Sequence, residues 1–223
     1  EIDKANERTA KIREIPNGSI TAKNALIFVI INSLLFIITT YYINTLCFAL
    51  SPVALVVILG YSYTKRFTAF CHLILGLGLS LAPIGAYLAV CGKFHITPIL
   101  FSGSVLFWVS GFDIIYSLQD QEFDKTQKLY SIPVLIGKKK ALILSIILHA
   151  ICIVTLVLAG IYGELGKWYW IGLLIFSLLL VYQHTLVKNH DLSRINLAFF
   201  TTNGIASVIF AAFVIFELYT TNL

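Results

Sequence analysis

Charged residues are scarce in this sequence. Lysine, arginine, aspartate and glutamate make up 12% of its 223 residues, whereas hydrophobic residues make up 58%. A soluble domain carries about 25% charged residues, so this composition excludes an ordinary soluble domain and indicates an integral membrane protein. The net charge of +5 is small, and in a membrane protein it reflects topology more than affinity for nucleic acid. We therefore expect a lipid bilayer as the surroundings and no nucleic-acid partner.

Paired cysteines and cysteine–histidine clusters are also lacking. The cysteines form no C-x-x-C pair, and no histidine lies at a metal-ligand spacing from any of them. Each cysteine lies within or at the end of an apolar segment, which is typical of a small packing residue. The histidines are scattered, and the sequence assigns them no role. These residues are Cys47, Cys71, Cys91 and Cys152, and His72, His95, His149, His184 and His190.

Long apolar stretches dominate the chain. A helix needs about 20 apolar residues to cross the hydrocarbon core of a membrane. The predicted spans are 25–43, 46–60, 70–91, 97–115, 141–162, 167–187 and 195–218. We therefore predict an all-α fold: a polytopic transmembrane helical bundle with seven helices, forming one domain over residues 1–223. The second span is short and contains Ser51-Pro52, which predicts a kink or a tilt.

The polar connections alternate in charge along the chain. One set comprises 1–24, 61–69, 116–140 and 188–194, with five, two, five and two basic residues in turn. The other connections have only Lys93 and the nearby Lys167, which completes the 16 basic residues. Basic residues concentrate in cytoplasmic loops of membrane proteins, so the first set is predicted to be cytoplasmic.

Three aspartates follow the fourth predicted span. If the helix continues at about 100° per residue, Asp113, Asp120 and Asp124 form a narrow stripe about 16 Å long, with Glu122 on the opposite face. Carboxylates in a stripe repel one another, and a divalent cation would relieve the repulsion. Their oxygens suit Mg²⁺, which is usually held by one or two carboxylates together with substrate phosphates.

Two basic clusters lie on the same predicted side as these acids. Lys65 and Arg66 follow the second span and could hold a phosphate, although topology alone also explains them. Residues 6–13 form a second basic and polar cluster. Acids for a metal and bases for phosphate on one side predict a diphosphate site at the membrane surface. The alternative is a solvated helix end whose acids pair with Lys125 and Lys128.

Together, these segments resemble the UbiA family of intramembrane aromatic prenyltransferases. The family's second aspartate-rich motif is similar to Asp113-x-x-Tyr116-x-x-x-Asp120-x-x-x-Asp124, and its downstream loop is similar to residues 129–137. The family's Y-x-x-x-K-R-x-T loop resembles Tyr61-x-x-x-Lys65-Arg66-Phe-Thr68. Residues 1–18 resemble the sequence after the first motif, N-D-x-x-D-x-x-x-D, with Asp3 as its last aspartate.

The resemblance implies nine helices in the intact fold, with the first motif after the second helix. This chain has seven predicted spans, begins near the end of that motif and contains no methionine. We therefore expect it to lack the N-terminal two helices and the front of the motif.

The resemblance also implies a function. Members transfer a polyprenyl group from polyprenyl diphosphate to an aromatic acceptor with Mg²⁺ as cofactor, and the expected acceptor is 4-hydroxybenzoate, in ubiquinone or menaquinone biosynthesis. The implied metal ligands are Asp113, Asp120, Asp124 and Asp3, the implied catalytic residues are Asp113, Asp120 and Tyr116, and the implied diphosphate-binding residues are Lys65, Arg66, Arg13 and Arg8. Residues 125–137 would cap the site, with Gly137 allowing a sharp turn. The expected location is the bacterial cytoplasmic (inner) membrane, with the active site facing the cytoplasm and no obligate protein partner.

Two alternatives stay open. Within the family, the acceptor would be a naphthoate of menaquinone synthesis. In a different class, the chain would be a small-molecule membrane transporter, which is expected to have charged or broken segments at mid-membrane and an internal repeat. The predicted helix centres contain almost no ionisable groups, which favours the enzyme.

Overall fold

The predicted all-α fold is confirmed. A computed structural model describes residues 2–188 and 190–221, and the side chains of these residues except Ile2, Asp3, Glu7 and Arg8. The chain is 81% helical, with no strand in the described residues. Within the same ranges, seven helices are long and apolar enough to cross a membrane.

The helices form an ordered series along the chain. The long ones are α3 (Ala22–Ile43), α4 (Thr45–Thr64), α5 (Cys71–Cys91), α6 (Ile96–Ser117), α9 (Lys138–Tyr162), α10 (Lys167–Leu186) and α11 (Asn203–Thr221). The short ones are α1 (Ile2–Ala5), α2 (Glu7–Ala10), the 3₁₀ turn η1 (Leu118–Asp120), α7 (Gln121–Thr126), α8 (Ile132–Ile136) and the π-helical η2 (Leu197–Thr202). Pro52 lies inside α4, and the helix continues past it to Thr64.

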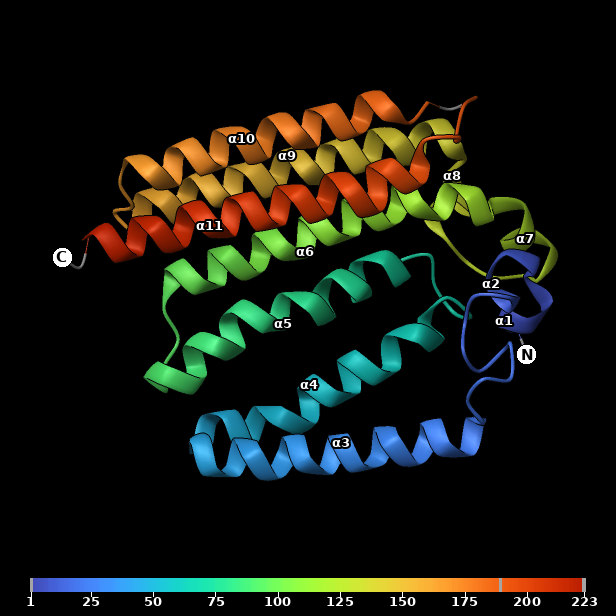
Figure 1. Ribbon diagram of the computed structural model, residues 1–223, viewed down its shortest axis with the longest axis horizontal. Helices are drawn as coiled ribbons and strands as arrows, with labels where there is room; N and C mark the ends of the chain where they lie inside the picture. Colours follow the sequence, from blue (N-terminus) through green and yellow to red (C-terminus); the bar gives the residue numbers. More distant parts are fainter. Residues whose placement is uncertain (1, 189, 222–223) are drawn as a thin grey trace.

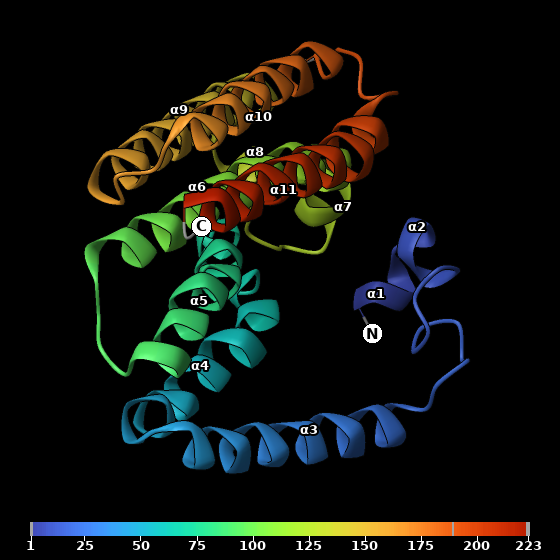
Figure 2. The same ribbon diagram turned by 60° about the vertical axis from the view of Figure 1, so that its left-hand side comes forward.

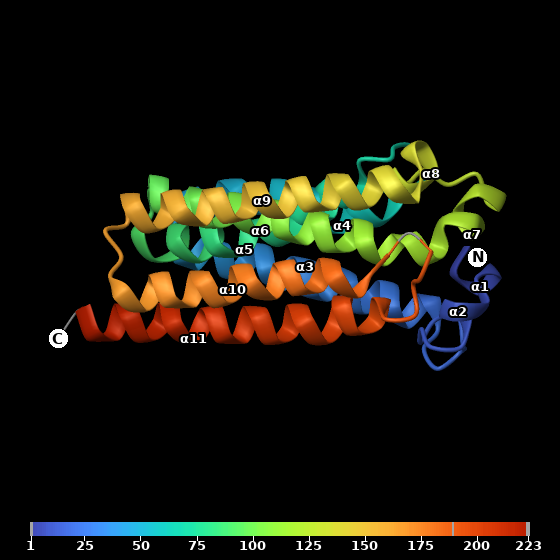
Figure 3. The ribbon, with the colours of Figure 1, turned by 90° about the horizontal axis from the view of Figure 1, so that it is seen from above.

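Each long helix packs against the next, in the order α3, α4, α5, α6, α9, α10 and α11. Figure 3 shows these helices running side by side along the length of the molecule. Figure 2 shows α3, α4 and α5 as one group of helices and α9, α10 and α11 as another, with α6 between the two groups. The row also curls, because η2 packs against α6.

The connections fall at two ends of the bundle. In Figure 1, α1, α2, α7 and α8 gather at one end with the α4–α5 and α10–α11 connections, whereas the C-terminus and the remaining short connections lie at the other end. The two sets of polar connections distinguished by their basic residues therefore lie at opposite ends. The polar end brings together segments far apart in sequence.

The outer helices expose their apolar side chains. Only Thr40 in α3 and Ser51 in α4 are buried, whereas large side chains such as Phe28 and Val56 are exposed. Apolar exposure of this extent is expected on a surface covered by lipid tails, which are as apolar as leucine.

The centre of the bundle is α6, which packs against α5 and α9. At the α6–α9 contact, a Cβ atom at Gly111 would collide with the His149 ring, so this close approach requires glycine. His149 Nε2 donates to the Trp108 carbonyl (3.2 Å), and its Nδ1 accepts from His184 Nε2 (2.9 Å). Two histidines without an assigned role thus form a hydrogen-bonded pair that joins α9, α10 and α6.

Candidate active site

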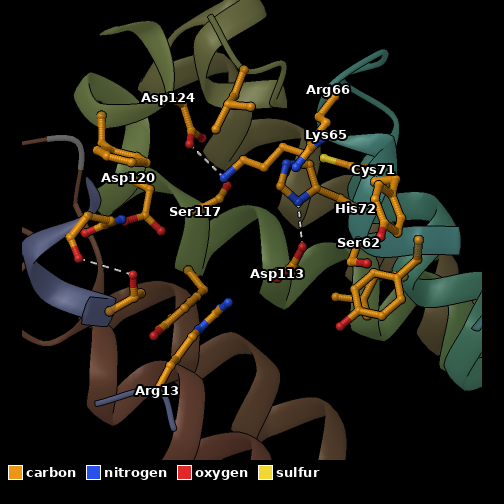
Figure 4. Close-up of a pocket in the computed structure, with 18 of the residues that line it drawn as sticks. Arg13, Ser62, Lys65, Arg66, Cys71, His72, Asp113, Ser117, Asp120 and Asp124 are labelled. Carbon is orange, nitrogen blue, oxygen red and sulfur yellow. Dashed lines mark hydrogen bonds and ion pairs between the residues drawn. The ribbon is translucent and has the colours of Figure 1, made fainter. Parts of the chain in front are cut away.

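A cavity of about 570 Å³ opens at the polar end of the bundle. It is lined by parts of the N-terminal segment, the end of α4, the start of α5 and the region from α6 to α7. The predicted site residues that line it are Asp113, Tyr116, Asp120, Asp124, Lys65, Arg66 and Arg13. The side chains of two other predicted site residues, Asp3 and Arg8, lie outside the described residues. Figure 4 shows the acidic and basic side chains arranged around this space.

Asp113 lies in the last turns of α6, and its side chain is 22% exposed. Its Oδ2 is 2.6 Å from Nδ1 of His72, which is in the first turn of α5. The sequence alone indicated no role for this histidine. The only signal in the sequence is its position, four residues after the end of the segment that resembles Y-x-x-x-K-R-x-T.

The three aspartates do not lie on one continuous α-helix. The expected continuous helix instead tightens into the 3₁₀ turn Leu118–Asp120 before α7 begins. A 3₁₀ turn advances about 120° per residue instead of 100°, so three such residues rotate the following part by about 60°. Asp120 accepts a hydrogen bond from Asn6 Nδ2 (3.4 Å), which links this turn to the N-terminal segment.

Asp124 is fully buried, and it pairs with Lys65. The Lys65 Nζ atom is 2.8 Å from Asp124 Oδ1, and the lysine side chain is 31% exposed. Lys125, which the alternative interpretation paired with the aspartates, instead pairs with Glu122 at 3.1 Å on the surface. The buried carboxylate of Asp124 therefore holds the ammonium group of Lys65 beside the cavity.

The remaining basic residues line other parts of the cavity. The Arg66 guanidinium lies over the Tyr63 ring, 5.5 Å from its centroid. Arg13 comes from the N-terminal segment, and in Figure 4 its guanidinium points toward the middle of the cavity. Cations from two separate segments thus share one space with the carboxylates.

Aromatic side chains separate this cavity from an apolar pocket. The Tyr116 ring, which lines the polar cavity, stacks on Phe199 with centroids 4.1 Å apart. Phe199 and Phe200 belong to η2, and both line a second pocket of about 420 Å³ between α5, α6 and the start of α11. Trp108 and Phe112 of α6 line the same pocket. π-Helical segments often occur at functional sites, and no signal in the sequence indicated this one.

The segment after α7 lies along the α4–α5 connection. The Tyr130 N–H donates to the Lys65 carbonyl (2.8 Å), and the Ile132 N–H donates to His72 Nε2 (3.4 Å). Gly137 has a φ of +80° where this segment enters α9, which confirms the sharp turn expected there. Residues 129–132 are thus held beside the cavity, with Leu129 in its lining and the N–H groups of Tyr130 and Ile132 bound to Lys65 and His72.

Replacing Gly137 with alanine is expected to lower the free energy of unfolding by about 1–3 kcal/mol, because its backbone region is essentially reserved for glycine. No atom within 4 Å would obstruct the added Cβ, so strain alone acts. Thermal unfolding in detergent micelles measures the effect. Gly60→Ala is the matched control: Gly60 lies in α4, also has no atom within 4 Å of a Cβ and has no positive φ. Equal stability of the two variants would contradict the prediction.

The donor set suits a divalent metal shared with a substrate. Among the residues whose side chains are described, no group of three or more histidine, cysteine, aspartate or glutamate residues is close enough to hold a metal ion alone. Asp113 and Asp120 nevertheless line one cavity with several cations. Mg²⁺ is typically bound through one or two carboxylates plus substrate phosphates rather than by a protein cage, so these residues fit such an ion.

Carboxylates and cations thus line a cavity beside an apolar pocket in a bundle of membrane-length helices. Comparison with known proteins identifies the family. Residues 1–214 match the UbiA prenyltransferase family. The chain is similar to a solved apo structure of a UbiA homolog from Aeropyrum pernix K1, with a TM-score of 0.87 and 28% identity, covering 97% of this chain and 80% of that one.

Two curated relatives are named 4-hydroxybenzoate octaprenyltransferase. The protein from Francisella tularensis subsp. novicida is 29% identical over 215 residues, covering 96% of this chain and 75% of the relative. The protein from Vesicomyosocius okutanii subsp. Calyptogena okutanii is 29% identical over 214 residues, covering 96% and 78%. The chain belongs to the UbiA prenyltransferase family, and it is an integral membrane prenyltransferase. Members of this family generally depend on a divalent metal.

Proposed function

We propose that this protein transfers a polyprenyl group from polyprenyl diphosphate to 4-hydroxybenzoate, with Mg²⁺, in quinone biosynthesis. The observation that supports this proposal most strongly is the adjacency of two unlike chambers. One has carboxylates and cations in its lining, the other is apolar and aromatic, and the Tyr116–Phe199 stack lies between them. A prenyl diphosphate has the same division into a charged head and an apolar tail.

The polar chamber would hold the diphosphate. Lys65, Arg66 and Arg13 would contact its oxygens, because fixed cations in a water-poor site stabilise developing negative charge. Asp113 and Asp120 would hold Mg²⁺, with Asp3 as a further ligand. When bound, the metal neutralises charge on the leaving group as a Lewis acid. In this assignment Asp124, predicted as a ligand, orients Lys65 instead.

The reaction would take place at the boundary of the two chambers. The bond between C1 of the prenyl chain and the diphosphate oxygen breaks, and its electron pair leaves with the diphosphate. A carbon of the electron-rich acceptor ring bonds to C1, and the ring then loses the proton from that carbon. Tyr116 would stabilise the allylic cation with the face of its ring, and the apolar pocket would keep water away from it.

The protein would lie in the inner membrane of a bacterium, and its site would face the cytoplasm. The connections that contain 14 of the 16 basic residues lie at the same end of the bundle as the cavity. Basic loops of membrane proteins stay on the cytoplasmic side. A water-soluble aromatic acid would therefore reach the cavity directly, while the prenyl chain would enter from the bilayer.

Membranes that contain the full-length protein test this proposal. We expect labelled polyprenyl diphosphate and 4-hydroxybenzoate to give a prenylated product with Mg²⁺ present, and no product with EDTA or without the acceptor. A dihydroxynaphthoate in place of 4-hydroxybenzoate tests the alternative acceptor, and a product from it alone would correct only the acceptor. If neither acceptor is prenylated and no diphosphate is released, the proposed reaction fails.

A further inference from the structure

His72 is a buried side chain that uses both ring nitrogens. Its relative exposure is 2%. Nδ1 is 2.6 Å from Asp113 Oδ2, and Nε2 is 3.4 Å from the backbone nitrogen of Ile132. One histidine therefore joins a carboxylate in the cavity wall to the segment that runs beside the cavity, as Figure 4 shows for the aspartate contact.

The two partners determine which ring nitrogen has the hydrogen. The Ile132 N–H can only donate, so Nε2 accepts. Nδ1 then has the hydrogen and donates it to Asp113. This bond occupies Oδ2 and leaves Oδ1 for a ligand in the cavity that Asp113 lines.

The backbone of His72 also contacts α6. The Ser110 hydroxyl is within hydrogen-bond distance of the His72 carbonyl (3.2 Å) and of the Leu106 carbonyl in its own helix (2.7 Å). One turn further along α5, a Cβ atom at Gly76 would collide with the Leu106 carbonyl. The close packing of α5 on α6 thus fixes the distance from which His72 reaches Asp113.

We propose that His72 is a positioning residue for Asp113. By fixing one carboxylate oxygen, it directs the other toward the metal and diphosphate in the cavity, and it ties that orientation to the position of Ile132. The inference rests on the proposed function, because it assigns Asp113 as a metal ligand. Partners of metal ligands act in this way elsewhere, and their loss typically costs 10–100-fold in metal affinity or activity.

Asparagine and methionine at position 72 provide a contrasting pair of variants. The side-chain nitrogen of asparagine is bonded to Cγ, as Nδ1 of histidine is, so asparagine can donate to Asp113, whereas methionine has no N–H group. Methionine also adapts to irregular packing, so the His72→Met variant is expected to fold. His149→Met removes another buried histidine of the bundle, away from the cavity, and controls for the general cost of such a loss.

Two measurements are made on each full-length variant in detergent or membranes. The first is the Mg²⁺ concentration that gives half the maximal rate, together with kcat at saturating Mg²⁺. The second needs no turnover: it is the Mg²⁺ concentration that gives half the thermal stabilisation observed with inorganic diphosphate present. We expect His72→Met to raise both Mg²⁺ concentrations by about 10–100-fold. His72→Asn should stay close to the wild type, and His149→Met should leave both Mg²⁺ concentrations unchanged.

Equal Mg²⁺ dependence in the wild type and His72→Met would overturn the inference, as would equal defects in the asparagine and methionine variants. If His72→Met is not recovered folded, the same titrations on His72→Leu decide, since leucine has the shape of asparagine but no N–H group to donate to Asp113. If the wild type transfers the prenyl group and His72→Met has the same Mg²⁺ dependence, this inference alone fails. A wild type with neither transfer nor stabilisation by Mg²⁺ and diphosphate overturns the proposed function and this inference together.

Discussion

Substituting Asp120 with asparagine is expected to lower the rate of prenyl transfer by about 10²–10³-fold, the loss typical of removing one preorganised group that stabilises a transition state. The change keeps the size of the side chain and removes its charge. Asp120 lies in a short 3₁₀ turn at the cavity and accepts a hydrogen bond from Asn6, a contact that asparagine can retain through its carbonyl oxygen. The loss should therefore fall on the chemistry rather than on folding. Initial rates with labelled polyprenyl diphosphate at several Mg²⁺ concentrations measure it.

Glu122→Gln is the control for this experiment. Glu122 is two residues further along the chain, its side chain is 77% exposed, and it contacts Lys125 on the surface. Removal of its charge should leave the rate unchanged, because an exposed ion pair of this kind contributes little. A rate close to the wild type in Asp120→Asn, or an equal loss in Glu122→Gln, would show that the carboxylate at position 120 has no special role.

The seven spans could be predicted because a bilayer fixes the length of an apolar helix. A clear difference concerns α4, which is predicted over 46–60 but extends over Thr45–Thr64. Its last residues include Tyr61 and Tyr63, which end an apolar run by composition yet suit the membrane–water interface. Hydropathy therefore marks where the hydrocarbon core ends, whereas the helix itself continues to the basic residues beyond.

The candidate site was predictable in composition but not in geometry. The spacing of Asp113, Asp120 and Asp124 assumed a uniform helix, and the 3₁₀ turn at Leu118–Asp120 changed the direction of the last carboxylate. Whether three residues tighten depends on tertiary packing, which the local sequence does not reveal. The contact between His72 and Asp113 joins residues 41 positions apart. No periodicity in a single sequence relates such positions, so only the packing of α5 on α6 identifies the pair.

The pairing of Lys65 with Asp124 predicts the second large effect. Substitution of Lys65 is expected to lower both stability and activity, and the two losses have different causes. Lys65→Met leaves the fully buried carboxylate of Asp124 without its cation. Removing one partner of a buried pair costs about 3–5 kcal/mol, and the partial exposure of Lys65 favours the lower end. The same change removes a cation expected to contact the diphosphate. We therefore expect a loss of about 3 kcal/mol in the free energy of unfolding and a rate about 10²–10³-fold lower.

The double variant Lys65→Met with Asp124→Asn distinguishes the two roles of the lysine. A neutral asparagine does not need the cation, so most of the stability should return, measured by thermal unfolding in micelles, while transfer stays slow. Lys125→Met, which breaks only the surface pair with Glu122, should cost about 0–1 kcal/mol and leave transfer intact. Recovery of the rate in the double variant would mean that Lys65 acts only as the partner of Asp124. In that case, of the three cations assigned to the diphosphate, only Arg66 and Arg13 would remain to hold it.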